Sequence, residues 1–203
     1  MIRNARVRQE VAHNIEKYEG RVRHLYLDTE GNVTVGVGHM IPNAASMADV
    51  SLYRTGELAP ADSVEKRDEY IAIKNQPYGR DYPAHYYQTT AALFMRDDDI
   101  SAQRDRHIQT FYWELKSYYT TANGFPSELD DMPEEVQLAL FDMVFNLGIT
   151  KLRNQYILFN NALKAERWKD AAAQSNRLGI QPTRNQYVRT LLMAAAANKQ
   201  PSR

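Results

Sequence analysis

The chain has 203 residues, contains no cysteine, and balances 25 Lys and Arg residues against 25 Asp and Glu residues. This length suits one domain, or one domain in two lobes, with a substantial hydrophobic core. The composition is that of a globular protein, and it excludes disulfide scaffolds and cysteine-ligated zinc sites. A formal net charge of zero argues against a protein whose whole surface binds nucleic acid or acidic lipid.

The charge is unevenly distributed along the chain. Residues 1–40 carry 6 basic and 5 acidic side chains, residues 41–131 carry 9 and 15, and residues 132–203 carry 10 and 5. The asymmetry has two interpretations, which are ordinary surface variation and an acidic segment that faces a partner.

The first forty residues predict one helix followed by a β-hairpin. Val7, Val11 and Ile15 have helical spacing, so we expect a helix over about residues 6–18 that ends at Gly20. This places Glu19 on the last turn or just beyond it. Residues 23–27 and 33–37 alternate with a period of two around the turn sequence 28–32, which is typical of a hairpin.

The rest of the chain predicts mostly helices. Residues 41–88 contain four prolines and no sustained period, so we expect loops with short helices there. A long helical pattern covers residues 89–119, and a helix over 134–147, apolar on nearly every side, should end at Gly148. Further helices are expected over about 154–164, over 167–178 and after Pro182. The predicted fold class is therefore α+β, mostly α, with a small antiparallel sheet near the N-terminus.

The hairpin makes a geometric prediction. If its turn centres near Gly31, Asp28 and Thr34 are cross-strand partners, with Cβ atoms roughly 5 Å apart. The same face continues through Gly36 and Gly38, whose missing side chains would leave a floor for a bulky substrate, and Glu19 would overhang it.

Two carboxylates across a groove are what glycoside hydrolysis requires, because one donates a proton to the leaving oxygen and the other activates water or attacks the sugar. The same residues also have common local roles, with Asp28 opening a turn and Thr34 filling a strand position.

No cofactor or metal site is predicted. The segment Gly36-Val37-Gly38 lacks the third glycine of a dinucleotide-binding loop, and no Walker loop or His-Glu-x-x-His motif is present. The five histidines share no metal-ligand spacing. We therefore expect no metal and no cofactor.

The hairpin region resembles the active-site segment of the phage-type lysozymes, the family of the T-even phage endolysin. That family has Glu, eight residues, Asp or Cys, five residues and Thr, and Glu19, Asp28 and Thr34 reproduce this spacing. The resembling stretches are Tyr18-Glu19-Gly20, Leu25-Tyr26-Leu27-Asp28-Thr29-Glu30-Gly31 and Thr34-Val35-Gly36-Val37-Gly38-His39, then Leu93-Phe94 with Asp97, residues 143–148, residues 167–172 and residues 181–184. The resemblance covers most of residues 14–193 but leaves residues 41–88 unexplained.

The resemblance implies a two-lobed fold and a muramidase activity. It suggests an N-terminal lobe over about residues 14–88, a connecting helix over about 89–112 and a C-terminal lobe over about 113–197 of a single catalytic domain. The implied reaction is hydrolysis of the β-1,4 bond between N-acetylmuramic acid and N-acetylglucosamine, with inversion. In these roles Glu19 is the general acid, while Asp28 and Thr34 position and activate the water.

The resemblance also implies supporting and substrate-binding residues. Arg184 matches an arginine that pairs with the catalytic Glu, and His39 and Asp97 match a stabilising His–Asp ion pair. The substrate-binding positions are Gly36, Gly38, Met40, Phe145 and Asn146, of which Met40 and Asn146 differ in residue type from the family.

Several alternatives stay open at this point. Within enzymes the alternative is a lytic transglycosylase, and outside them a non-catalytic peptidoglycan-binding module. The expected partner is the peptidoglycan glycan strand, with no nucleic acid and no membrane insertion, and the protein is expected to be a monomer. No Sec-type signal is predicted, which fits synthesis in the cytoplasm and action on the cell wall. Delivery would be by a holin, for an endolysin, or by a secretion system, for an injected effector domain with a carrier and an immunity protein.

Overall fold

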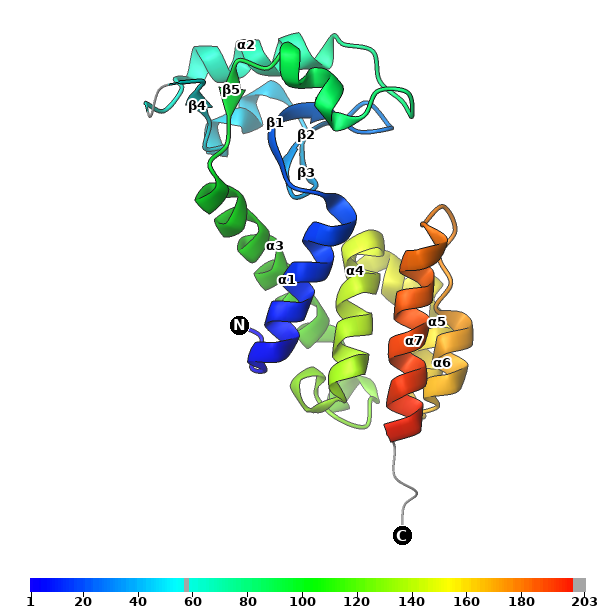
Figure 1. The fold of residues 1–203 in the computed structure, drawn as a ribbon. Coiled ribbons are helices and arrows are strands. Elements are labelled where there is room, and N and C mark those ends of the chain that lie inside the picture. The colour runs from blue at the N-terminus through cyan, green and yellow to red at the C-terminus, as the bar shows by residue number, and fades with distance from the viewer. Residues whose placement is uncertain (57–58, 199–203) are drawn as a thin grey trace. The chain divides into compact units, whose positions relative to one another are not determined.

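The structure, a computed structural model, describes residues 1–56 and 59–198; residues 57 and 58 of the expected loop region lie outside the described residues. Helices hold 62% of the chain and strands 9%, with one three-stranded antiparallel sheet near the N-terminus. This confirms the predicted α+β, mostly α, class. Figure 1 shows the order of the elements along the chain.

The chain forms two compact units. Unit 1 comprises residues 1–18 and 107–203, and unit 2 comprises residues 19–106. The chain passes from one unit to the other within two helices, α1 (Ala5–Glu19) and α3 (Asp97–Tyr118). Each unit is described by itself below.

Unit 2 contains the strands. β1 (Val22–Leu27), β2 (Val33–Gly36) and β3 (His39–Ile41) form the three-stranded sheet in that order, and β4 (Tyr53–Arg54) pairs with β5 (Leu93–Phe94). The helical elements are α2 (Ser63–Lys74) and the 3-10 turns η1 (Ala44–Asp49) and η2 (Ala84–Thr89). The core is formed by buried aliphatic and aromatic residues, among them Leu25, Val33, Val35, Leu52, Ile73 and Tyr87.

Unit 1 is helical. It contains α1, the second part of α3, α4 (Glu134–Gln155), α5 (Ile157–Lys164), α6 (Trp168–Gln174) and α7 (Pro182–Asn198), with short 3-10 turns η3 (Thr121–Asn123) and η4 (Leu129–Asp131). α7 packs on both α4 and α6. The predicted end of the apolar helix at Gly148 is confirmed as a kink, because Gly148 has φ 68° and ψ 157° inside α4.

Residues 63–74 form a helix of three turns within the region expected to hold short helices, and a capping box between Asp62 and Glu65 fixes its start. Other predicted boundaries are wrong. The helix expected from residue 89 begins at Asp97 instead, because Leu93 and Phe94 pair with β4. The helices expected over 154–164 and 167–178 cover only residues 157–164 and 168–174.

Candidate active site

Glu19 is the last residue of α1, as the sequence predicts. Gly20 follows with φ +77°, a conformation that favours glycine, and lets the chain turn directly into β1. Gly38 lies against the half-buried Glu19 side chain, since a Cβ placed on Gly38 would stand 3.2 Å from the Glu19 carboxylate oxygen Oε2. The backbone of the β2–β3 turn therefore borders the Glu19 carboxylate.

The predicted register of the hairpin is wrong by one residue at its centre. Thr34 pairs with Tyr26 rather than Asp28, and Leu27 pairs with Val33. The turn closes one step earlier because the Asp28 N–H donates to the Asn32 carbonyl (3.0 Å). Asp28 and Thr34 are consequently diagonal neighbours on one face of the hairpin, with a separation of roughly 7–8 Å typical of such pairs.

The Asp28 carboxylate organises this turn. Its Oδ1 accepts hydrogen bonds from the backbone N–H groups of Glu30 (2.9 Å) and Asn32 (2.8 Å), and its Oδ2 accepts one from the Asn32 side-chain amide (3.0 Å). A carboxylate can accept about four hydrogen bonds. Oδ2 therefore retains acceptor capacity for a further donor such as water.

The face next to Asp28 is a row of three residues across the sheet. Thr34 lies opposite Tyr26 on one side and opposite Met40 on the other. Met40 is 50% exposed, whereas Thr34 is buried and its hydroxyl donates to the Asn32 carbonyl (3.1 Å). Because that proton is committed, the Thr34 oxygen can only accept a hydrogen bond from an incoming group.

Tyr26 belongs to the surroundings of the candidate site, although its sequence position was not singled out. Burial raises its pKa to about 12, and the negative charges of Glu19 and Asp28 add to this increase. Both carboxylates therefore lie within electrostatic reach of one phenol, which stays neutral at physiological pH. The sequence did carry a signal, because Tyr26 precedes Asp28 by two residues and so shares its strand face.

Gly36 differs from the prediction. A Cβ at Gly36 would stand 2.2 Å from the side-chain oxygen Oε1 of Gln103 on α3. The space over Gly36 is therefore filled by Gln103, and the expected open floor is absent at this position. Gly38 is the glycine of this face that borders a predicted catalytic group.

The implied ion pair between His39 and Asp97 stays a prediction, and Asp97 has a different cationic partner in the structure. The Arg21 guanidinium binds the Asp97 carboxylate, with Nε 3.1 Å from Oδ1. The pKa of His39 is lowered by burial and by the positive charge of Arg106. A carboxylate partner would raise this pKa, so its direction is opposite to that of the implied pair.

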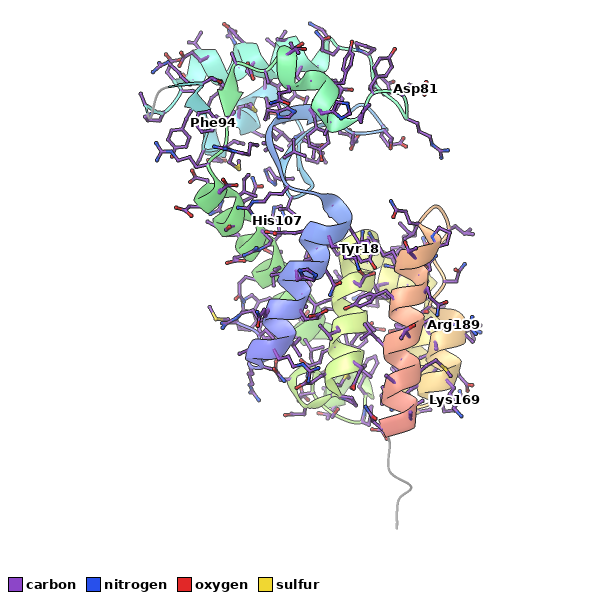
Figure 2. The ribbon with its side chains drawn as sticks, in the orientation of Figure 1. Tyr18, Asp81, Phe94, His107, Lys169 and Arg189 are labelled. Atoms are coloured by element: carbon purple, nitrogen blue, oxygen red, sulfur yellow. The ribbon has the colours of Figure 1, made fainter. Side chains whose placement is uncertain are left out.

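Arg184, Phe145 and Asn146 lie in unit 1. The Arg184 Nε donates to the Asp142 carboxylate (3.1 Å), and the guanidinium lies over the rings of Tyr18 (4.9 Å) and Phe145 (5.7 Å). The same Asp142 binds the fully buried Arg177 (2.6 Å), which also donates to the Asn146 amide oxygen. Figure 2 labels Tyr18, the residue immediately before Glu19 on α1.

Unit 2 also has two pockets near its small β4–β5 sheet. One of about 350 Å³ is lined by Arg23, His24 and Phe94 among others, and one of about 780 Å³ by Arg54, Glu65 and Glu69 among others. None of the predicted site residues lines either pocket. Glu69 is satisfied by the backbone N–H groups of Ala92 and Leu93 (2.9–3.1 Å), which indicates a structural role.

Within residues 1–56 and 59–198, no three His, Asp or Glu side chains are grouped so as to hold a metal ion. Over the same residues, no helix combines the length and the apolar character needed to cross a bilayer.

No protein-family model matches this chain, and a search of curated proteins found no match.

Proposed function

We propose that the protein is a peptidoglycan hydrolase, a muramidase that cleaves the bond between N-acetylmuramic acid and N-acetylglucosamine. The observation that carries the proposal is that Asp28 shares one face of the hairpin with the buried Thr34, while the Glu19 carboxylate borders Gly38 in the turn after β2. The motif spacing of Glu19, Asp28 and Thr34, and its resemblance to the phage-type lysozymes, supports the same reaction.

In the proposed reaction, Glu19 is the general acid. Its protonated carboxyl donates a proton to the glycosidic oxygen as the bond to the anomeric carbon breaks. A water held by the Asp28 Oδ2 and the Thr34 oxygen attacks that carbon from the opposite face. Both protein atoms are acceptors in this geometry, so they orient the water's protons and leave its oxygen lone pair for the attack. The water's proton passes to Asp28, and the configuration is inverted.

The resemblance assigns Arg184 a supporting role, and we include that role in the proposal. Within unit 1, the bond from Arg184 to Asp142 offsets part of the positive charge of the guanidinium.

The test is a Glu19→Gln variant assayed on purified cell walls. We expect its clearing rate to fall by roughly 10²–10⁴-fold, the contribution typical of a general acid. Glu30→Gln is the matched control, because Glu30 is an exposed carboxylate of the β1–β2 turn. Wild-type clearing by Glu19→Gln would refute the proposal.

A second candidate is a lytic transglycosylase, which needs only the acid. The three hydrogen bonds that Asp28 accepts within its own turn favour this alternative, because they give the carboxylate a structural task. Asp28→Asn separates the two candidates, since the amide oxygen can still accept the two backbone hydrogen bonds made to Oδ1, whereas the charge and the bond from the Asn32 side chain are lost. A muramidase should lose most of its activity and release reducing ends, whereas a transglycosylase should keep its activity and release 1,6-anhydro ends, which mass spectrometry distinguishes.

The biological setting of the enzyme is proposed from the family resemblance alone. The partner is the peptidoglycan glycan strand, and delivery to the wall is by a holin or by a secretion system. In the second setting an immunity protein would bind the enzyme.

A further inference from the structure

The segment between α2 and β5 is rich in tyrosine and belongs to the part of the chain that the family resemblance does not explain. It contains Tyr78, Tyr82, Tyr86 and Tyr87 within ten residues. Its formal charges are one arginine and one aspartate, Arg80 and Asp81, so its ionised side chains cancel. Figure 2 labels Asp81 in this segment.

This segment is anchored to the turn that carries Asp28. The Tyr78 ring lies against the backbone of Gly31, where an added Cβ would stand 3.0 Å from the ring carbons. The ammonium group of Lys74, the last residue of α2, donates to the Gly31 carbonyl (2.6 Å). The tyrosine segment and the Asp28 turn are therefore packed together within unit 2.

The anchoring continues through a buried residue. Tyr87 is completely buried, and its hydroxyl donates to the Pro77 carbonyl (2.8 Å), which ties the two ends of the segment. Burial raises the pKa of Tyr87, and Asp28 is among the charges that add to the increase. The carboxylate of the candidate site is thus within electrostatic reach of this segment.

Two rings of the segment remain exposed although they are held in place. Tyr78 is 57% exposed and Tyr86 is 40% exposed. The Tyr86 ring contacts those of Tyr82 (centroids 5.0 Å apart) and Tyr87 (5.2 Å), both edge-to-face. Rings fixed in this way lose little conformational freedom on binding, so they present apolar area with a polar hydroxyl at low entropic cost.

We propose that Tyr78, Tyr82 and Tyr86 form a platform that binds the glycan strand beyond the sugars cleaved at Glu19 and Asp28. The inference rests on the proposed function, which supplies the glycan as ligand. Pyranose rings present apolar C–H faces for stacking on aromatic rings, and their hydroxyl groups suit the phenolic oxygens. Because its charges cancel, the segment has no net positive charge to attract an acidic peptide, and the uncharged N-acetylglucosamine units of the strand are the sugars that we expect to stack on it.

The experiment measures binding rather than cleavage, in the full chain carrying Glu19→Gln. Tyr78→Ala with Tyr86→Ala removes both exposed rings, and Tyr78→Phe with Tyr86→Phe keeps the rings and removes the hydroxyls. Trp113→Ala is the control, because Trp113 is similarly exposed (56%) but lies on α3 in unit 1. The probes are peptide-free glycan strands from purified walls and chitotetraose, with folding checked by circular dichroism.

The alanine pair should weaken binding to long strands by about tenfold, the loss expected for two aromatic contacts. Binding to chitotetraose should not change, and the phenylalanine pair and Trp113→Ala should bind long strands nearly as the parent does. Equal binding of long strands by the alanine pair and the parent would overturn the platform. So would an equal loss on both probes, which would indicate a disturbed Asp28 turn, and so would tyrosine-dependent capture of a protein with no effect on glycan.

These outcomes are separate from the test of the function. If wild-type protein leaves walls intact but the tyrosines still govern glycan binding, the hydrolase proposal fails and the platform stands. If the wild-type protein clears walls but glycan binding does not depend on the tyrosines, only the platform proposal is refuted.

Discussion

Gly38 shows how one missing side chain shapes the surroundings of Glu19. Gly38 and Gly36 both have positive φ values, +64° and +68°. Their neighbours differ, because Gly38 borders the Glu19 carboxylate whereas Gly36 borders the buried Gln103. The two glycines therefore have separable consequences, one for the carboxylate and one for packing.

We expect Gly38→Ala to cost about 1–2 kcal/mol of unfolding free energy through its backbone conformation. The new methyl group should also displace the Glu19 carboxylate and lower the rate of wall clearing. Gly36→Ala should lose more stability, because Gln103 must also move. Urea unfolding and a turbidity assay measure the two effects.

Gly56→Ala provides the control. Gly56 has φ +82° and no neighbour within 4 Å of an added Cβ, so it carries the backbone cost alone. A Gly38→Ala variant that matched Gly56→Ala in both stability and activity would contradict the proximity argument.

At the scale of elements, α4 and α7 are joined by a buried charge cluster. Asp142 on α4 binds Arg184 on α7 and Arg177 in the preceding loop, and all three side chains are at most 7% exposed. Arg177 also donates to the Asp142 and Arg184 carbonyls. One carboxylate thus binds two guanidinium groups, and removing it would leave the fully buried Arg177 without this charge partner.

Asp142→Asn should therefore destabilise the protein by roughly 3–5 kcal/mol. Asp170→Asn is the matched control, because the Asp170–Arg167 pair (3.3 Å) is exposed and should contribute at most about 1 kcal/mol. Chemical denaturation followed by circular dichroism compares them. Similar losses in the two variants would show that the cluster is not a stabilising contact between α4 and α7.

The elements that could be predicted from the sequence are those that depend on residues close together in the chain. The positions of α1, the β1–β2 hairpin and the Gly148 kink follow from apolar spacing and glycine. The start of α2 was also readable, since Asp62 and Glu65 have capping-box spacing. The pairing of β4 with β5 was not, because each strand has two residues and forms only through its distant partner.

The same distinction applies to the residues of the candidate site. Glu19 was placed by the helix pattern, and Tyr26 could have been found from strand alternation. The hairpin register depends on which backbone N–H groups donate hydrogen bonds to the Asp28 carboxylate. The residue types in the turn do not determine that choice. The Asp142 cluster joins residues separated by 35 and 42 positions, so no sequence spacing points to it.

For the molecule as a whole, His39 gives stability a defined pH dependence. The folded-state pKa of His39 is lowered from 6.5 by burial and Arg106. As the pH falls below about 6.5, the unfolded chain takes up a proton that the folded protein still excludes. This contribution is fully present above about pH 6.5 and is lost as the pH falls through the folded-state pKa.

We expect the free energy of unfolding to decrease as the pH falls below about 6.5, and His39→Gln to flatten this decrease. Arg106→Gln should raise the pKa of His39, which NMR titration measures directly. An ion pair with Asp97 would give the reverse trend, with stability lost as the pH rises, so the sign of the slope decides between the two environments.

The division of the chain into two units also has a consequence for synthesis. Unit 2 is a continuous stretch, whereas unit 1 needs residues 1–18 together with residues from 107 onward. On the ribosome, α1 therefore emerges long before the helices that complete its unit, and residues 19–106 are the first complete set able to fold. Until then Val7, Val11 and Ile15, buried in the finished protein, form an uncovered apolar face on the nascent chain.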